Sequence, residues 1–531
     1  MSAAATSVPT ASNMAPVQSR ARMSLADVSV VALFAVIAAL ATSHHERWSD
    51  EAQAWLLARD SGIGEMFVRW MPYEGSPMLW HLVLKAAQAL HLPYASISWI
   101  SVVLMIAGTW VWVRCAPFPR VIRYTFPFTY FILYQYTVVA RSYALLPVLL
   151  FTAAYLYCRE RTPVWPFTLV LILLANATFH GTMMALAFAT LHLLRTLRGW
   201  SALDSDTRAR FVTAALVFAL CIGLLYMGLR PPDDSKGWHE YNETTLERVE
   251  RSLNALVGAI SGVEGLTAAI IAFAVVLSVE LGNALALVLF VVPIAAFIGF
   301  VFGGSYHHGT VLLAFTAAMW VGWDKLAKGR QLSVTAQKVQ RVLGILVMTA
   351  VAIQVYWSCC SVYNDWRKPY SGSLAAMEYL KKMGADKQKI YSYHFHSVAI
   401  LAYFDHNIFA NQVYNGGKSF WIQSTGNLLD YVLPTVERDQ PDWIILPHGI
   451  RGNIMPEARY ISACGYSDAV RFTGQRFYKD GVLQPETYFI YHRLPGALST
   501  SEARAKCAAA WQVLYKRRRI DYAHMPSATG P

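Results

Sequence analysis

The first long apolar run of the chain, Leu25–Ser43, is followed at once by Trp48-Ser49-Asp50-Glu51-Ala52-Gln53-Ala54-Trp55-Leu56-Leu57-Ala58-Arg59-Asp60. Charge beside a membrane-length apolar run is costly, so it marks either a functional site or a helix end. Ser49 or Asp50 would cap a helix over Glu51–Arg59, with Glu51 favoured by the helix dipole. Both interpretations can hold together, and Asp50 and Glu51 are the candidate catalytic residues.

The composition is that of a membrane protein with a soluble portion. The 531 residues are 55% hydrophobic and 15% charged, and the mean hydropathy is positive. The net charge of +12 comes from basic residues between the apolar runs, as membrane topology requires, so no nucleic acid is expected as a partner. Residues 1–24 are polar and Ala/Ser-rich, which predicts a disordered cytoplasmic arm without a signal peptide.

Apolar runs without the alternation of strands recur through residues 25–360 and predict transmembrane helices. The run Pro77–Leu92 decides the topology. If it crosses the membrane, four later clusters of Arg and Lys fall outside, against the positive-inside rule. If it lies in the interface, those clusters are cytoplasmic and the loop 44–94 is external. This second alternative predicts about eleven spans and an external C-terminus.

Residues 361–496 are richer in polar and charged residues and predict an external α/β domain, followed by a C-terminal helix and tail over 497–531. One helix is expected over Ser373–Met383. The β-branched and aromatic stretches that predict strands are Ile390–Tyr393, Asp442–Leu446 and Tyr488–His492. Cys464 and Cys507 would pair if this domain lies outside the cytoplasm, which the sequence leaves open. The predicted fold class is an α-helical polytopic membrane protein with a C-terminal soluble α/β domain.

The segment Arg141-Ser142-Tyr143 falls at the outer end of a span. An arginine there is either a snorkelling anchor or the partner of an anion. The positive-inside rule disfavours arginine on this side, which favours the second interpretation. A guanidinium binds a phosphate or a carboxylate in bidentate fashion, so Arg141 and Tyr143 are candidate substrate-binding residues.

Histidines mark other outer ends, at His180 and at Tyr306-His307-His308. Histidine binds phosphate, acts as acid or base, or holds a metal, but these are also ordinary polar helix ends. No triplet of ligands at fixed spacing occurs, so no zinc site is expected. The loop Arg230–Glu250 is either a lid over the site or a solvated connector.

Three features together resemble the GT-C glycosyltransferases. They are the pair Asp50-Glu51 after a first span, an interfacial helix, and the segment Gly75-Ser76-Pro77-Met78-Leu79-Trp80. These include the protein O-mannosyltransferases and the bacterial aminoarabinose and lipopolysaccharide-core sugar transferases. Many bacterial members carry Tyr-x-x-Glu-Ala-Arg-x-Tyr-Ala-Leu, which corresponds here to the segment Tyr136–Leu145. Val139 replaces the glutamate, and Ser76-Pro77 replaces a Pro-Pro pair. The resemblance covers about residues 25–360.

The resemblance implies a sugar donor linked to polyprenyl phosphate and an acceptor hydroxyl on a glycan, glycolipid or protein. Asp50 would be the general base of an inverting displacement, and Arg141 would bind the leaving phosphate. Lesser candidates for substrate binding are His81, Lys85, His180, His307, His308 and Glu74. Some members use a divalent metal near the first acidic residue, which leaves metal dependence open. The implied location is the periplasmic face of a bacterial inner membrane.

Two other classes of function remain open from the sequence. The chain could be a transporter in which Asp50 and Arg141 gate or bind substrate, or a non-catalytic GT-C-fold partner subunit in cell-envelope glycan assembly. Transporters usually place ionisable groups near the bilayer midplane. The candidate residues here collect at outer helix ends, which favours the transferase.

Overall fold

The computed structural model describes residues 24–235, 243–412, 416–424, 432–448 and 461–518. The arm expected over residues 1–24 lies outside the described residues apart from Ser24. The centre of the loop Arg230–Glu250 and the tail beyond Arg518 also lie outside them.

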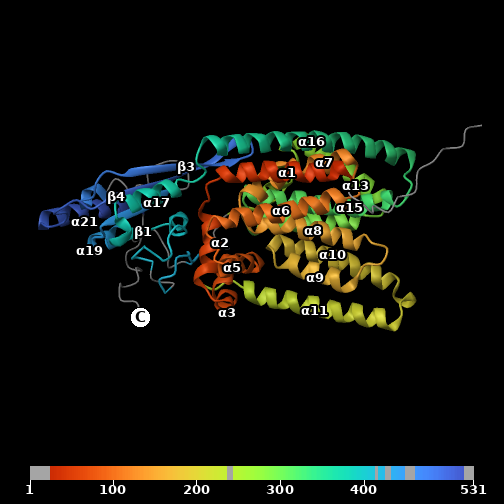
Figure 1. Cartoon of the computed structure of the whole chain (residues 1–531), viewed down its shortest axis with the longest axis horizontal. Coiled ribbons are helices and arrows are strands. Elements are labelled where there is room, and N and C mark those ends of the chain that lie inside the picture. The colour runs from red at the N-terminus through yellow and green to blue at the C-terminus, as the bar shows by residue number, and fades with distance from the viewer. Residues whose placement is uncertain (1–23, 236–242, 413–415, 425–431, 449–460, 519–531) are drawn as a thin grey trace, which may run out of the picture.

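A helical bundle forms one end of the molecule and the C-terminal domain forms the other (Figure 1). Ser24 caps the first helix, accepting the N–H of Asp27. The bundle helices are α1 (Leu25–His44), α6 (Ser96–Cys115), α8 (Leu145–Tyr157), α9 (Val164–Ala175), α10 (Phe179–Arg198), α11 (Ser205–Leu229), α12 (Thr245–Ile260), α13 (Glu264–Glu280), α14 (Ala284–Phe300), α15 (His308–Ala327) and α16 (Val334–Arg367).

The apolar helices indicate a membrane protein, but the expected count of eleven spans is not supported. By length and composition, four described helices are able to cross a membrane: α1, α6, α11 and α16. A fifth is added if α12 and α13, which bend by 86° at their junction, count as one span. Two physical reasons account for this: α10 and α15 have 20 residues each but are not apolar enough, and other helices are too short. Helix α9 has 12 residues, which rise about 18 Å and fall short of a hydrocarbon core of about 30 Å.

One of the apolar runs that predict transmembrane helices, Val121–Val139, is broken in the structure. It forms α7 (Arg120–Thr125), the 3₁₀ turn η2 (Phe126–Phe128) and the π-helix η3 (Tyr130–Val138). Every residue of η3 is buried. This irregular segment leads to Ala140 and Arg141 at the end of the bundle next to α2, where the 3₁₀ turn η4 (Ser142–Ala144) begins.

The loop 44–94 folds into a stack of short helices between the bundle and the C-terminal domain (Figure 1). These are α2 (Ser49–Asp60), α3 (Ile63–Glu65), η1 (Met66–Trp70), α4 (Met71–Glu74) and α5 (Leu79–Ala89). Helix α5, with 11 residues, is too short to span and packs on α2. The N-cap of α2 is Trp48, so the expectation that Ser49 or Asp50 caps this helix is wrong. Glu51 instead accepts the N–H of Trp48.

The C-terminal domain contains a four-stranded sheet in the order β1-β2-β4-β3, which agrees with the expected α/β composition. The strands are β1 (Ile390–Ser392), β2 (Trp443–His448), β3 (Val470–Tyr478) and β4 (Gly481–His492). The pair β1–β2 is parallel, and the other two pairs are antiparallel. The helices α17 (Ser373–Lys382), α19 (Val432–Asp439) and α21 (Ser501–Arg518) accompany the sheet.

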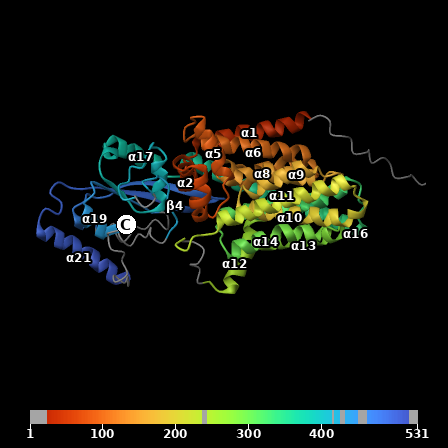
Figure 2. The same ribbon diagram turned by 90° about the horizontal axis from the view of Figure 1, so that it is seen from below.

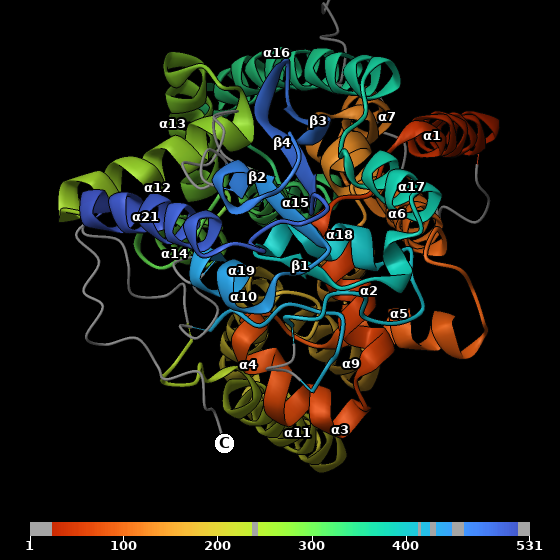
Figure 3. The same ribbon diagram turned by 90° about the vertical axis from the view of Figure 1, so that its left-hand side faces the viewer.

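The domain docks on α2 through paired hydrogen bonds. Gln53 donates to the carbonyl of Trp421 at 2.7 Å and accepts the N–H of the same residue at 2.9 Å. Asp60 accepts the N–H of Ser419 at 2.7 Å. Figure 2 shows α2 between the domain and the bundle, and Figure 3 shows β3 and β4 reaching past it toward α16. These hydrogen bonds fix the middle and the C-terminal end of α2 to the C-terminal domain.

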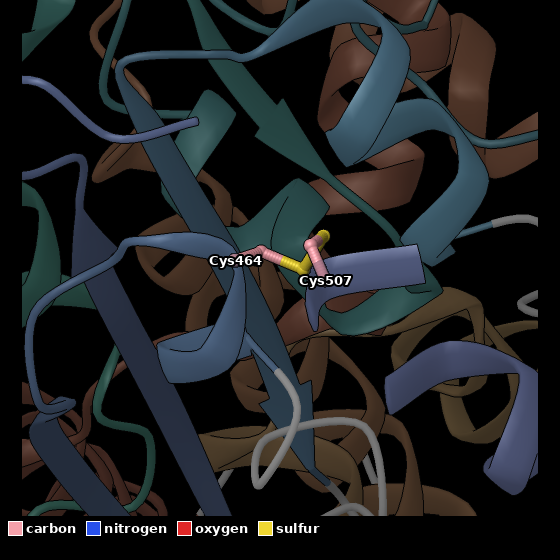
Figure 4. The surroundings of a disulfide bond; sticks show 2 residues. All are labelled: Cys464 and Cys507. Atoms are coloured by element: carbon pink, nitrogen blue, oxygen red, sulfur yellow. A yellow bond between two sulfur atoms is a disulfide. The ribbon is translucent and has the colours of Figure 1, made fainter. Parts of the chain in front are cut away.

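Cys464 and Cys507 form a disulfide bond that ties α21 to the turn after α19 and β2 (Figure 4). Both cysteines are buried in a small apolar cluster with Ile461 and Tyr466. The bond closes a loop with a sequence separation of 43.

We expect Cys464→Ser to lower the stability of the C-terminal domain by about 2–5 kcal/mol, because the open loop regains chain entropy in the unfolded state. Limited proteolysis of the full-length protein should release α21 sooner than in wild type. The matched control is Cys221→Ser, which changes a cysteine that is not in a disulfide. Equal cleavage of all three proteins would contradict the prediction.

Candidate functional site

A cavity of about 410 Å³ opens at the end of the bundle where α2 and α4 meet η4 and the N-terminus of α15. Helix α2 presents Asp50 in its first turn and Gln53 three residues later, so both reach the same side of the helix. The candidate residues that line the cavity are Asp50, Glu74, His81, Arg141, Tyr143, His180 and His307. Tyr306, Trp80 and Gln423 complete its polar and aromatic wall.

Asp50 and Arg141 form a direct ion pair in this cavity. Arg141 Nη2 lies 2.9 Å from Asp50 Oδ2, and the two side chains are 18% and 19% exposed. Burial acts to lower the pKa of Arg141, but the carboxylate of Asp50 outweighs it and holds this pKa above its usual range. The guanidinium also lies over the rings of Tyr306, at 4.5 Å, and Tyr143, at 5.2 Å, which is favourable for a cation.

Besides the indole Nε1 of Trp80, three polar atoms of the candidate residues in the cavity are buried without a hydrogen-bond partner among the described residues. They are Arg141 Nη1, His81 Nδ1 and His180 Nε2. Burial lowers the pKa of His81 to about 4, so its ring is neutral at pH 7. A neutral imidazole offers one donor and one acceptor. Buried polar groups are normally satisfied, so this arrangement suits a ligand that carries several oxygen atoms.

Glu74 contributes a second carboxyl group to the cavity wall. Gln53 Nε2 donates to its Oε1 at 2.6 Å. Burial raises the pKa of Glu74 to about 7, although the hydrogen bond from Gln53 opposes this. The negative charge of Asp50 raises it further, and Arg141 lowers it. Glu74 is therefore able to hold or release a proton near neutral pH.

Glu51 does not line the cavity, although it adjoins Asp50 in sequence. Its side chain is fully buried on the bundle side of α2. Oε1 accepts the N–H of Ala140 at 2.9 Å, and Oε2 accepts the N–H of Trp48 at 3.0 Å and a proton of His45 at 3.3 Å. The structure therefore separates the two acids, with Asp50 at the cavity and Glu51 in the packed interior.

Lys85 and His308 also lie away from the cavity. Lys85 Nζ donates to the carbonyls of Ala58 and Ser61, where it closes the end of α2. His308 Nδ1 faces the hydroxyl of Tyr478 at 3.3 Å, which places it against β3. Neither residue contacts Asp50 or Arg141, so the structure brings seven of the ten candidate residues to one cavity wall.

Sequence reasoning did not select Gln53, Tyr306, His45 or Asp365 as site residues. Gln53 carries a local signal, because it follows Asp50 at helical spacing. Tyr306 lies beside two histidines that the sequence does mark. His45 and Asp365 are 320 residues apart, and no local pattern joins them.

Comparison with protein-family models, with curated proteins and with solved structures finds no match for this chain. The resemblance to GT-C glycosyltransferases gains no support from these comparisons. The function is therefore proposed from the geometry of the cavity.

The residues around Asp50 do not fit a divalent ion. Asp50 is engaged by Arg141, and within the described residues no group of three or more His, Cys, Asp and Glu side chains is arranged to hold a metal. Divalent cations of the magnesium or calcium type need several oxygen ligands.

The stability of the fold should depend on pH through His45. Burial lowers its pKa, but Asp365 and Glu51 outweigh burial and raise it from 6.5 to about 10. The folded state binds this proton more tightly than the unfolded state does. The resulting stabilisation is complete below about pH 6.5 and is lost as the pH rises through about 10.

We therefore expect the midpoint of thermal unfolding to fall between pH 7 and pH 10 in wild type, and to fall less in His45→Gln. The difference between the two proteins isolates His45 from other groups that titrate in this range. Parallel curves for wild type and variant would show that His45 carries no linked proton.

Proposed function

We propose that this protein is a membrane glycosyltransferase that moves a sugar from a polyprenyl-phosphate donor to an acceptor hydroxyl. The observation that carries the proposal is the Asp50–Arg141 pair, which lines a cavity at the outer end of an apolar bundle. In that cavity Arg141 Nη1, His81 Nδ1 and His180 Nε2 are buried without partners among the described residues. A lipid phosphate carries oxygens for these groups and reaches the site from the bilayer.

The reaction would be a single displacement at the anomeric carbon of the sugar. The acceptor oxygen forms a bond to this carbon as its proton passes to Asp50. The bond from the carbon to the phosphate oxygen breaks, and its electron pair leaves with the phosphate. Arg141 stabilises the charge that develops on the leaving group, and fixed donors of this kind are usually the largest single contribution to catalysis.

The ion pair prepares both residues for these roles. Before the donor binds, Arg141 compensates the charge of Asp50 in a partly buried site, where an unpaired carboxylate is costly. The unpartnered Nη1 allows the same guanidinium to contact a phosphate while Nη2 stays near Asp50. A guanidinium suits this double contact because its donors form a planar fork.

The external location is part of the proposal. The disulfide between Cys464 and Cys507 is typical of an oxidising compartment, such as the bacterial periplasm. The C-terminal domain that contains it docks on α2, which also carries Asp50. We therefore place the cavity and the C-terminal domain on the periplasmic side of a bacterial inner membrane.

The purified full-length protein in nanodiscs, supplied with a radiolabelled polyprenyl-phosphate sugar and a membrane lipid extract, tests the proposal. Label should pass from the donor to a second product, and polyprenyl phosphate should accumulate in equal amount. A transporter would move the donor without breaking the sugar–phosphate bond, and a partner subunit would release no label. Either result would replace the proposed function.

A further inference from the structure

We propose that Glu51, His45 and Asp365 form a buried chain of contacts that positions Arg141 against Asp50. These three are positioning residues, because none of them lines the cavity in which the reaction is proposed. The inference deepens the proposed function and rests on it for its activity measurement.

The chain of contacts is continuous from α16 to the residue before Arg141. Asp365 Oδ2 lies 2.7 Å from His45 Nδ1, and His45 Nε2 lies 3.3 Å from Glu51 Oε2. Glu51 Oε1 then accepts the N–H of Ala140 at 2.9 Å. The three side chains are no more than 1% exposed. The hydroxyl of Tyr134 adds a fourth group by donating to Asp365 at 3.1 Å.

Glu51 holds the two backbone segments that carry the ion pair. It follows Asp50 directly on α2, and its carboxylate binds the peptide N–H that precedes Arg141. Arg141 itself is in extended conformation, with φ −128° and ψ 172°. Its carbonyl accepts the N–H of Ala144 at 3.0 Å, which ties it forward to η4, while Glu51 holds the peptide N–H of the residue before it. One carboxylate therefore bridges the two segments that carry Asp50 and Arg141.

Charge explains why histidine occupies the middle position. Two buried carboxylates, Glu51 and Asp365, face the same ring. Burial opposes a charge on His45, but these two acids raise its pKa to about 10, so the ring is an imidazolium at neutral pH. Both of its N–H groups then donate, one to each acid. Removing one member of a buried ionic group leaves uncompensated charge and is strongly destabilising.

The first test is Glu51→Asp, which keeps the charge and shortens the side chain by about 1.5 Å. The N–H of Ala140 then loses its acceptor. We expect amide exchange in a peptide covering residues 136–145 to become about tenfold faster or more. We also expect the KM for the polyprenyl-phosphate sugar to rise about tenfold or more while the KM for the acceptor is unchanged, since small displacements of positioned groups cost large factors in rate.

The matched control is Glu46→Asp, the same change in the same loop. Glu46 accepts the N–H of Leu374 at 2.8 Å and faces the C-terminal domain rather than Ala140. The Glu46→Asp variant should keep both KM values and the amide exchange of residues 136–145 at their wild-type values. A purely structural role for Glu51 would lower the active fraction, which reduces the maximal rate and moves neither KM.

The second test is a double-mutant cycle of His45→Gln and Asp365→Asn. His45→Gln leaves Glu51 and Asp365 facing each other without a cation, so it should reduce the kcat/KM for the donor strongly. Adding Asp365→Asn removes one of the two charges and should recover about tenfold of that loss, because residues in one network are not additive. If the loss of kcat/KM in the double variant equals the product of the losses in the two single variants, the inference is wrong.

Failure of the inference and failure of the proposed function give different results. If wild type transfers no sugar, the proposed function is wrong, and the exchange of residues 136–145 in Glu51→Asp decides the positioning role without any activity. If wild type transfers sugar but Glu51→Asp changes neither the exchange nor the donor KM, the positioning role is wrong and the proposed function stands.

Discussion

Asp50→Asn should reduce sugar transfer about a thousandfold, because general-base catalysis contributes roughly 10²–10⁴ in rate. Asparagine keeps the size of the side chain and one oxygen for Arg141, but it cannot take a proton from the acceptor. The measurement is label transfer from radiolabelled polyprenyl-phosphate sugar by the purified variant at saturating donor. Transfer as fast as that of wild type would show that Asp50 is not the base.

The same variant should bind the donor at least as tightly as wild type does. In the proposed complex the carboxylate of Asp50 would compete with the lipid phosphate for Arg141 and repel it, since both anions would approach the same guanidinium. Removing the charge should therefore lower the Kd for polyprenyl phosphate a few-fold, as expected for loss of one like charge at partly solvated distance. A rise in Kd together with lost transfer would indicate a damaged cavity rather than a missing base.

Asp60→Asn is the matched control for this prediction. Asp60 lies at the other end of α2 and also pairs with an arginine, with Arg59 Nε at 2.6 Å. It faces Ser419 of the C-terminal domain and does not line the cavity. Asparagine retains an oxygen that accepts the N–H of Ser419, so transfer by this variant should stay close to that of wild type.

Arg141→Lys should reduce kcat for sugar transfer about a hundredfold and raise the KM for the donor, since removal of one positioned donor costs roughly 10²–10³ in rate. Lysine keeps the charge, but its ammonium group is a point charge that cannot contact Asp50 and a phosphate through a planar fork. Arg141→Gln should be more severe, because it also leaves Asp50 uncompensated next to the incoming phosphate. Steady-state kinetics with varied donor separate the two effects.

A double variant distinguishes lost charge balance from lost catalysis. Asp50→Asn combined with Arg141→Gln removes both members of the ion pair and restores neutrality. We expect it to recover part of the donor affinity that Arg141→Gln loses, but none of the transfer. Unchanged donor affinity in Arg141→Gln alone would show that Arg141 does not contact the phosphate. Arg59→Lys, at the far end of α2, provides the control.

The positive-inside rule predicts that Asp50 and Arg141 share one side of the membrane. The structure joins them at 2.9 Å although they lie 91 positions apart. The C-terminal α/β character was equally predictable, because β-branched and aromatic stretches stand out after the last apolar run. The pairing order of the strands was not, since no local pattern specifies which strands become neighbours.

The count of spans was the least predictable feature of the bundle. Hydropathy identifies apolar runs, but it does not show where a helix breaks inside one. In the sequence, residues 120–144 form one apolar run and the beginning of the next. The structure instead divides them among α7, η2, η3 and η4. These breaks are tolerated because the segment is buried in protein, where irregular backbone finds partners that lipid does not supply.

The sequence alone determined that Asp50 and Glu51 lie at the start of a helix directly after a membrane-length apolar run, because that run and the helix-forming residues after it are local features. Only the tertiary structure decided that Asp50 faces the cavity and Glu51 the interior. Adjacent residues of an α-helix point about 100° apart, so two neighbouring acids cannot share one face. Which of the two meets Arg141 depends on how α2 is clamped between η3, α16 and the C-terminal domain, through residues hundreds of positions away.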